Sequence, residues 1–193
     1  MTSSINQNFR IDRVTTKTGD QGQTSVADGK RIPKDSQRIS AIGDIDELNS
    51  LLGVLISTLP ADLNLLTIKT IRTQLTRIQH ELFEAGGELA IPGSSRIHEI
   101  HIAQLESEIE IYLDQLPALQ EFILPGGSYP ASLCHLTRSV SRRAERTLVH
   151  LHHEFPQNPT LLIYFNRLSD WLFVLARILN LSMGQPEVFW KSS

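Results

Sequence analysis

Cysteine, aromatic residues and long apolar runs are all scarce in this chain of 193 residues. The single cysteine, Cys134, excludes a disulfide within the chain and a metal site built on paired cysteines, and it fits a reducing compartment. No apolar run approaches the roughly 18 residues of a membrane-spanning helix, and the first residues lack the apolar stretch of a signal peptide. We therefore expect a cytoplasmic protein without a membrane segment.

The charge is also small, with a net value of -3 and a pI near 6.2, which counts against bulk binding of nucleic acid. The hydrophobic share of 40% and the charged share of 20% are those of an ordinary globular protein. The length predicts a single domain. We divide it into an N-terminal segment (1–35), a helical part (36–182) and a C-terminal tail (183–193).

Apolar residues recur at three- and four-residue spacing from about Ser36 onward, which is the period of an amphipathic helix. Prolines and glycines interrupt the pattern and mark its ends, and Ser128 followed by Pro130 is a typical helix start. Short connections between long helices make neighbours antiparallel, so the fold class is an all-α, five-helix bundle. The predicted helices lie near residues 36–58, 63–89, 97–116, 128–153 and 159–182.

The fourth predicted helix has a second, charged face. Arg138 and Arg142 lie one turn apart with Glu145 beside them, and like charges at this spacing destabilise a helix unless an anion offsets them. A solvated face on which Glu145 screens the arginines is the commoner explanation for an arbitrary helix, but the four arginines between residues 138 and 146 weigh against it. The predicted buried stripe of this helix consists of Leu133, Leu136, Val140, Ala144 and Leu151.

The fifth predicted helix repeats this design, because Asn166, Asp170, Phe173 and Arg177 share a face away from its leucines. Burial of Phe173 against a partner helix or a second subunit would explain an aromatic residue there. On the first helix Asp46 and Gly53 line one ridge with Asn49 beside it, for which a structural and a functional interpretation are equally good.

The N-terminal segment contains the stretch "TKTGDQGQTS" (16–25), which has two glycines and no apolar side chain. Such a loop can turn its backbone amides inward to bind phosphate, with Lys17 and Lys34 adding charge. The chain has neither the phosphate-binding motif GxxxxGK[ST] nor the dinucleotide-binding motif GxGxxG. Taken alone, such a stretch is more often a plain surface loop.

Five motifs follow one another along the chain: "TKTGDQGQTS", "DELNS", "FILPGGS", "SRRAER" and "FNRLSDWLFVLAR". In this order they resemble the PduO-type ATP:cob(I)alamin adenosyltransferases, and the resemblance covers about residues 16 to 180. It implies a homotrimer of five-helix bundles with active sites between adjacent subunits. The implied reaction transfers the 5′-deoxyadenosyl group of ATP to the cobalt of a reduced corrinoid such as cobalamin, releasing triphosphate.

The resemblance also implies roles for individual residues. Asp46 resembles the acid that pairs with Arg138 across the subunit interface, Arg142 and Asn166 resemble nucleotide-contacting residues, and Glu145 resembles a residue that helps order Mg²⁺ and phosphates. Lys34 looks like a further ATP-binding lysine. The residues that resemble the loop around the ATP triphosphate are Thr16, Lys17, Thr18, Gly19, Asp20, Gly22 and Thr24.

Phe122 resembles an aromatic residue that keeps the lower face of the corrinoid free of its axial ligand, which eases reduction of Co(II) to Co(I). Co(I) is then the nucleophile, and the protein positions C5′ and stabilises the leaving triphosphate. Ile42 departs from the pattern, because many members have tyrosine there, and we expect it to alter packing without touching a ligand. A cobalamin reductase or an adenosylcobalamin-dependent enzyme is a further expected partner.

Other interpretations of the same residues remain. A non-catalytic helical bundle that binds ATP or an acidic partner would explain the arginines but not the glycine-rich loop. An enzyme that hydrolyses ATP or transfers phosphate would need a base or nucleophile that the motifs do not offer. The histidines at 98 and 101 and in "HLHHE" (150–154) favour an exposed surface over a metal site, because no third ligand has clear spacing.

Overall fold

The computed structural model describes residue 15 and residues 17–27, 29–60 and 65–191. In these residues the chain forms a bundle of five helices, which confirms the predicted all-α class. The start predicted for the second helix lies outside the described residues, and the third helix is shorter at both ends than predicted. The helices are α1 (Gln37–Thr58), α2 (Leu65–Ala90), α3 (Glu99–Leu113), α4 (Tyr129–Glu154) and α5 (Pro159–Ser182).

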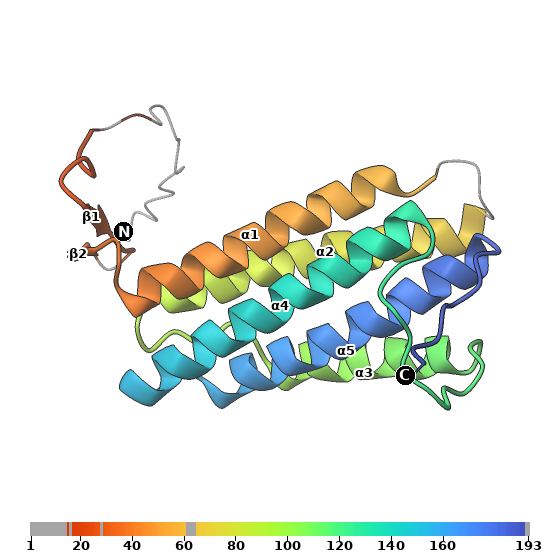
Figure 1. The fold of residues 1–193 in the computed structure, drawn as a ribbon. Coiled ribbons are helices and arrows are strands. Elements are labelled where there is room, and N and C mark those ends of the chain that lie inside the picture. The colour runs from red at the N-terminus through yellow and green to blue at the C-terminus, as the bar shows by residue number, and fades with distance from the viewer. Residues whose placement is uncertain (1–14, 16, 28, 61–64, 192–193) are drawn as a thin grey trace, which may run out of the picture.

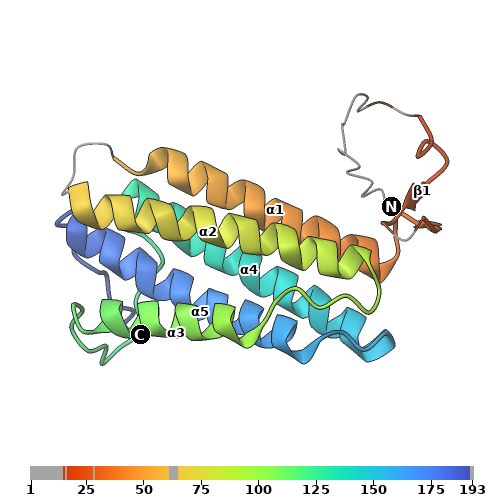
Figure 2. The same cartoon turned by 180° about the vertical axis from the view of Figure 1, so that it is seen from behind.

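The long helices lie lengthwise beside one another (Figure 1). Helix α1 contacts both α2 and α4, α4 contacts α5, and α3 packs on α5. Figure 2 shows α1 and α2 as an antiparallel pair on the opposite side of the bundle from α3. No helix among the described residues combines the length and the apolar character needed to cross a membrane.

The N-terminal segment contains a small hairpin that the sequence analysis did not predict. Strand β1 (Gln23–Ser25) pairs antiparallel with β2 (Arg31–Pro33), so that Thr24 lies opposite Ile32. The hairpin stands at the end of the bundle where α1 begins (Figure 1). It projects from the helices rather than packing into their core, because most of its residues are exposed.

Local sequence explains where α4 and α5 begin. The Ser128 hydroxyl accepts a hydrogen bond from the backbone nitrogen of Ala131 at 3.4 Å, which confirms the predicted cap, and Pro130 lies in the first turn. Asn158 caps α5 in the same way through the nitrogen of Thr160 at 3.1 Å. Both helices therefore start at side chains that satisfy otherwise unpaired amides.

The core of the bundle contains a buried polar network as well as aliphatic residues. Glu108 of α3 accepts hydrogen bonds from the Trp171 indole at 2.8 Å and from Arg77 at 2.9 and 3.1 Å. Glu81 of α2 accepts from the Tyr164 hydroxyl at 2.7 Å. Burial raises the pKa of Glu108 although Arg77 opposes the shift. Because a buried polar group without a partner is costly, this network fixes the register of α2, α3 and α5.

The buried stripe of α4 differs from the prediction at Leu136, which is exposed, and at Leu133, which is only partly buried. Its place is taken by smaller or more polar residues, among them Cys134, Thr137 and Ser141. Small side chains let a helix approach its neighbours closely, and the Cys134 thiol donates to the backbone oxygen of Leu172 in α5 at 3.2 Å. This contact gives the buried Cys134 a structural role.

Candidate active site

The glycine-rich stretch forms a tight turn that leads into the hairpin. The nitrogen of Gly22 donates to the oxygen of Gly19 at 3.2 Å, and the nitrogen of Lys34 donates to the oxygen of Gly22 at 2.9 Å. Gly22 has φ +79°, which favours glycine, and Lys17 also has a positive φ of 57°. Asp20 lies exposed in the turn, and Thr16 lies outside the described residues. The sequence-predicted loop is thus a folded turn.

Two basic side chains hold this turn. The Arg31 guanidinium donates to the backbone oxygen of Thr18 at 2.6 Å, so β2 supports the turn from below. Lys34 lies against Gly19: a Cβ added to Gly19 would sit 3.1 Å from the Lys34 ammonium nitrogen. The sequence analysis identified Lys34 but missed Arg31, whose only signal was its position between the glycine-rich stretch and α1.

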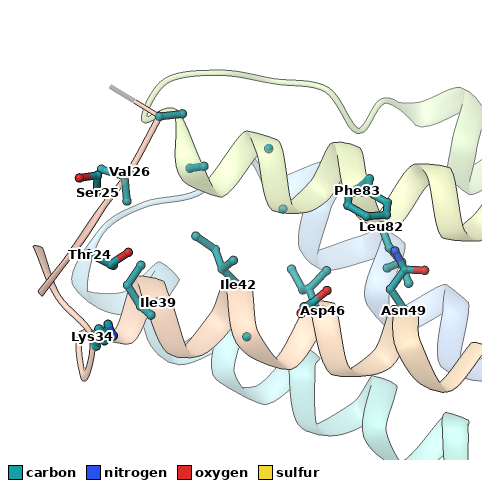
Figure 3. A pocket seen from close by; sticks show the side chains of 16 residues that line it. Thr24, Ser25, Val26, Lys34, Ile39, Ile42, Asp46, Asn49, Leu82 and Phe83 are labelled. Atoms are coloured by element: carbon teal, nitrogen blue, oxygen red, sulfur yellow. The ribbon is translucent and has the colours of Figure 1, made fainter. Parts of the chain in front are cut away.

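A cavity of about 770 Å³ opens between the hairpin, α1 and α2, and we call it the hairpin cavity (Figure 3). It brings together Thr24, Lys34 and Asp46 from the predicted site. In Figure 3, Ile42, Asp46 and Asn49 lie along the side of α1 that faces α2. The walls are mainly apolar, so a bound ligand would be held by shape with a few polar contacts at the rim.

Four further residues of this cavity were not assigned to the site by the sequence analysis. Phe83 of α2 is 72% exposed and lines the wall. One turn further along, Gly86 leaves open space, whereas a Cβ added to Gly87 would lie 3.3 Å from the Arg96 guanidinium. Ile42, which we expected to touch no ligand, also lines the cavity. An exposed aromatic residue followed by two glycines on a helix is the signal that could have found this wall.

The second group of predicted residues lies on α4 and α5. We call Arg138, Arg142, Glu145 and Asn166 the arginine face. Asn166 donates from its amide to a Glu145 carboxylate oxygen at 3.0 Å, so the two helices fix this pair relative to each other. Arg142 is exposed, and it shares with Glu145 a hollow of about 380 Å³ on the α4 surface. The sequence analysis placed Arg138, Arg142 and Glu145 on one face of the fourth helix, and the contact between Asn166 and Glu145 joins the fifth helix to that face.

Burial and like charge both act on Arg138. Burial lowers its pKa, and the positive charge of Arg142 lowers it further. Its guanidinium carbon lies 5.9 Å from the ring centre of Phe173, within the range of a cation–π contact. The Nε atom of Arg138 is buried and has no hydrogen-bond partner among the described residues. An anion placed here would relieve both the like charge and the missing partner.

His135 lies one turn before Arg138 and packs edge-on against Phe173, with ring centres 6.1 Å apart. It is 3% exposed, and neither ring nitrogen has a partner in the described part of the chain. Burial, followed by the charge of Arg138, lowers the pKa of His135 to about 4, while Glu187 opposes the shift. The ring is consequently neutral at pH 7.

The fifth helix needs no second subunit to explain its aromatic residue, because Phe173 is partly buried against His135 and Arg138 of the same chain. Arg177 is also turned inward: it is 3% exposed and forms an ion pair with Glu187 at 2.7 Å. Only the first half of the predicted polar face, at Asn166 and Asp170, is exposed.

The hairpin cavity and the arginine face lie on different sides of the chain. Helix α4 meets α1 through Arg143 and Thr147, which contact Asp44, whereas Asp46 points into the cavity beside α2. Among the described residues, Asp46 and Arg138 form no ion pair with each other. The third group is Phe122 alone, which lies in the connection between α3 and α4, outside both regions. One chain therefore carries the predicted site in separate pieces.

Comparison with known proteins shows a family match over most of the chain. Residues 14–179 match the sequence pattern of the family described as "Cobalamin adenosyltransferase". The chain belongs to the cobalamin adenosyltransferase family. It is 48% identical over 184 residues to a cobalamin adenosyltransferase of Cupriavidus metallidurans, covering 94% of this chain and 96% of the relative. It is 41% identical over 184 residues to the corrinoid adenosyltransferase of Bacillus subtilis, covering 94% and 93%.

Solved structures of the family have the same fold. A phenylalanine-to-alanine variant of the PduO-type ATP:corrinoid adenosyltransferase of Lactobacillus reuteri, complexed with cobalamin and ATP, superposes with a TM-score of 0.86. The two chains are 34% identical, and the match covers 93% of this chain and 100% of the other. An arginine-to-lysine variant of the same enzyme, complexed with ATP, gives a TM-score of 0.85 at 36% identity, covering 92% and 100%. The resemblance drawn from the sequence motifs is confirmed.

Proposed function

We propose that this cobalamin adenosyltransferase family member transfers the 5′-deoxyadenosyl group of ATP to the Co(I) of cobalamin or a related corrinoid. Co(I) attacks C5′ with its electron pair and a cobalt–carbon bond forms. The C5′–oxygen bond breaks, and triphosphate leaves with the bonding electrons. Family membership carries this proposal, supported by the relatives complexed with cobalamin and ATP. Because Co(I) is the nucleophile, the protein has to supply positioning and charge rather than a reactive side chain.

The assembly that we propose is a homotrimer with active sites between subunits. The separation of the hairpin cavity from the arginine face supports it, since each region presents only part of the predicted site. Contact between the cavity of one copy and the arginine face of the next is a head-to-tail interface, which closes into a ring when the rotation allows. Asp46 of one copy would then pair with Arg138 of the next.

In this assembly the turn and hairpin hold the nucleotide. The backbone amides of the Gly19–Gly22 turn and the Lys34 ammonium group face the triphosphate, with Arg138 and Arg142 completing its neutralisation from the other copy. These charges stabilise the leaving triphosphate, where negative charge builds up in the transition state. We assign the remaining nucleotide contacts to Thr16, Lys17, Thr18, Asp20, Thr24 and Asn166.

Magnesium enters this proposal as the ion that accompanies ATP. The Glu145 carboxylate is suited to contact this ion. One of its oxygens accepts a hydrogen bond from Asn166, and the other has no hydrogen-bond partner among the described residues. Carboxylate and phosphate oxygens are the ligands that Mg²⁺ takes. The ion would supply further charge neutralisation at the phosphates, while Glu145 and Asn166 keep the ligand oxygen in place.

Phe122 has a separate task in the proposal, at the lower face of the corrinoid. An aromatic side chain there would exclude the axial ligand and leave cobalt with four ligands, which eases reduction of Co(II) to Co(I). The proposed location is the cytoplasm. The proposed protein partner is a cobalamin reductase or an adenosylcobalamin-dependent enzyme. A non-catalytic bundle that binds ATP or an acidic partner is less well supported, because the relatives are adenosyltransferases.

The test is an anaerobic absorbance assay with purified protein, chemically reduced cob(I)alamin and MgATP. We expect a product spectrum that reverts on exposure to light, because the cobalt–carbon bond is photolabile, together with one triphosphate for each product formed. A reaction without protein is the control. Folded protein that binds ATP but forms no product would overturn the transferase proposal and favour the binding alternative.

A further inference from the structure

The connection between α3 and α4, residues 114–128, presents an exposed aromatic residue on a fixed backbone. Phe122 is 81% exposed, yet its backbone oxygen accepts a hydrogen bond from the nitrogen of Trp190 at 2.7 Å. Fixing the backbone of an exposed side chain adds no packing to the core. The fixed backbone therefore serves a molecule that the Phe122 side chain contacts, because binding residues act best on pre-organised backbones.

The restraint comes from residues 187–190, which we call the strap. The nitrogen of Leu124 donates to the oxygen of Val188 at 2.8 Å, and Ile123 forms an antiparallel bridge with Phe189. Together with the bond from Trp190, the strap therefore holds the chain on both sides of Ile123. Figures 1 and 2 show the C-terminal segment lying beside the connection between α3 and α4.

A buried ion pair anchors the strap to α5. Arg177 donates to Glu187 at 2.7 and 3.2 Å, and it also donates to the backbone oxygen of Pro117 at 2.8 Å. One guanidinium thus joins the strap to the beginning of the connecting segment. Because Arg177 is 3% exposed, water replaces these bonds poorly, and loss of either partner leaves a charge buried without compensation.

The far end of the connecting segment is held without the strap. The Asn180 side chain donates to the oxygen of Gly126 at 3.0 Å and accepts from the nitrogen of Ser128 at 2.9 Å. At Gly127, φ is +102° and an added Cβ would lie 2.2 Å from Asn180, so only glycine fits. The centre of the segment, with Phe122, depends on the strap, whereas its end depends on α5.

We propose that Arg177 and Glu187 are positioning residues, which act through the strap to hold Phe122 against the lower face of the corrinoid. This inference rests on the role that we propose for Phe122. Phe122 is the contacting residue, and the ion pair does not touch substrate. Weakening the strap should therefore impair the step that needs a four-ligand Co(II) corrinoid and should spare the transfer from Co(I).

Two changes test the strap at different points. Glu187→Gln removes the negative charge of the anchor, and the exposed Glu110→Gln is its control. Trp190→Pro removes the backbone donor to Phe122 while leaving the ion pair intact, and Trp190→Ala, which keeps that donor, is its control. Each protein is assayed with MgATP in two ways: with cob(II)alamin and a reductant, and with chemically prepared cob(I)alamin. The absorbance of four-ligand cob(II)alamin and the melting temperature are recorded alongside.

We expect Glu187→Gln and Trp190→Pro to lower the Co(II)-dependent rate and the four-ligand signal about tenfold, since small misplacements cost such factors. The Co(I)-dependent rate should stay within about twofold of the wild type. Equal losses in both assays, or no loss in either, would overturn the proposal. If Glu187→Gln does not fold, the two Trp190 variants decide. Wild-type protein inactive with cob(I)alamin would instead refute the proposed function.

Discussion

The hairpin cavity and the arginine face are built in opposite ways. The cavity is hollow and mostly apolar, its rim is an exposed hairpin, and among the described residues its charged lining consists of Lys34 and Asp46. The arginine face is carried by two helices of the core and bears its charges on their surface. The cavity therefore contributes shape and the face contributes charge. Neither region alone is sufficient to bind a triphosphate ester, because such a ligand needs an enclosing wall and also positive groups that neutralise its negative charge.

The two regions also differ in what they cost the fold. The arginine face and the neighbouring His135 ring bury three side-chain nitrogens without hydrogen-bond partners among the described residues, whereas the cavity lining buries one such atom, the Asn49 Oδ1. A buried polar group without a partner costs about 1–3 kcal/mol. More stability is therefore given up around the arginine face than around the cavity, where Lys34 and Asp46 remain exposed to water.

The largest loss of activity should come from removing a charged side chain from either region. Asp46→Ala and Arg138→Ala should each lower turnover about 100-fold or more, because each removes a charge from the site. If the regions meet between subunits, co-expression of the two variants should restore activity in about a quarter of the sites, since head-to-tail contacts then re-create intact pairs. Turnover of the mixed trimers is the measurement.

The control for this mixture is Asp46→Ala combined with a chain that carries both substitutions, in which no intact pair can form. Recovery only in the first mixture is the expected outcome. Near-normal rates in the single variants would refute the site assignment, and failure of the first mixture to recover would place both residues in one subunit's site.

The next effect concerns stability and separates the two regions by pH. Because the folded pKa of His135 is lowered to about 4, its neutral form is favoured in the fold and stability is lost as pH falls below about 6.5. Between pH 7 and pH 5 the loss should be about 2 kcal/mol. Urea unfolding of wild type and His135→Phe at both pH values measures it.

In His135→Phe this part of the pH dependence should disappear, whereas replacing the exposed His80 by glutamine should leave it intact. A variant with the same pH dependence as the wild type would show that His135 is not the source.

A pair of neighbouring arginines sharpens the definition of the face. Arg142→Ala should raise the KM for ATP about tenfold, since a charge-assisted hydrogen bond is lost. Arg143 pairs with Glu47 and Asp44 of α1, so Arg143→Ala should leave the KM within about twofold and cost at most about 1 kcal/mol of stability. Steady-state kinetics at saturating cob(I)alamin distinguish them. An equal rise in the KM for ATP in the two variants would show that the arginine face is not a distinct nucleotide-binding region.

The smallest effect should be found at the rim of the cavity. Lys34→Ala should raise the KM for ATP several-fold, roughly the value of one exposed charge, and Gly19→Ala should act in the same direction by displacing the Lys34 side chain. Lys30→Ala, in the same hairpin but outside the cavity lining, is the control. If Lys30→Ala has the larger effect, the hairpin binds the nucleotide through another side.

The helices were predictable because their information is local. Apolar spacing, the Ser128 cap and the prolines determine where a segment is helical, and each acts within a few residues. The predictions were wrong where packing against neighbouring helices determines burial. Leu136 is apolar yet exposed, because α4 turns small residues such as Ser141 towards α1 and α5. The hairpin was missed because its strands are three residues long and carry no alternating pattern.

Sequence order alone determined the five helices, the charged second face of α4 and the family, since motifs and periodicity are written along the chain. Only the tertiary structure decided what surrounds the polar faces of the helices. It turned Arg177 inward to Glu187, joined Asn166 to Glu145, and placed Asp46 in a cavity that Arg138 does not line. The physical reason is that burial and ion pairing depend on residues distant in sequence, whose approach is fixed by packing of the whole bundle.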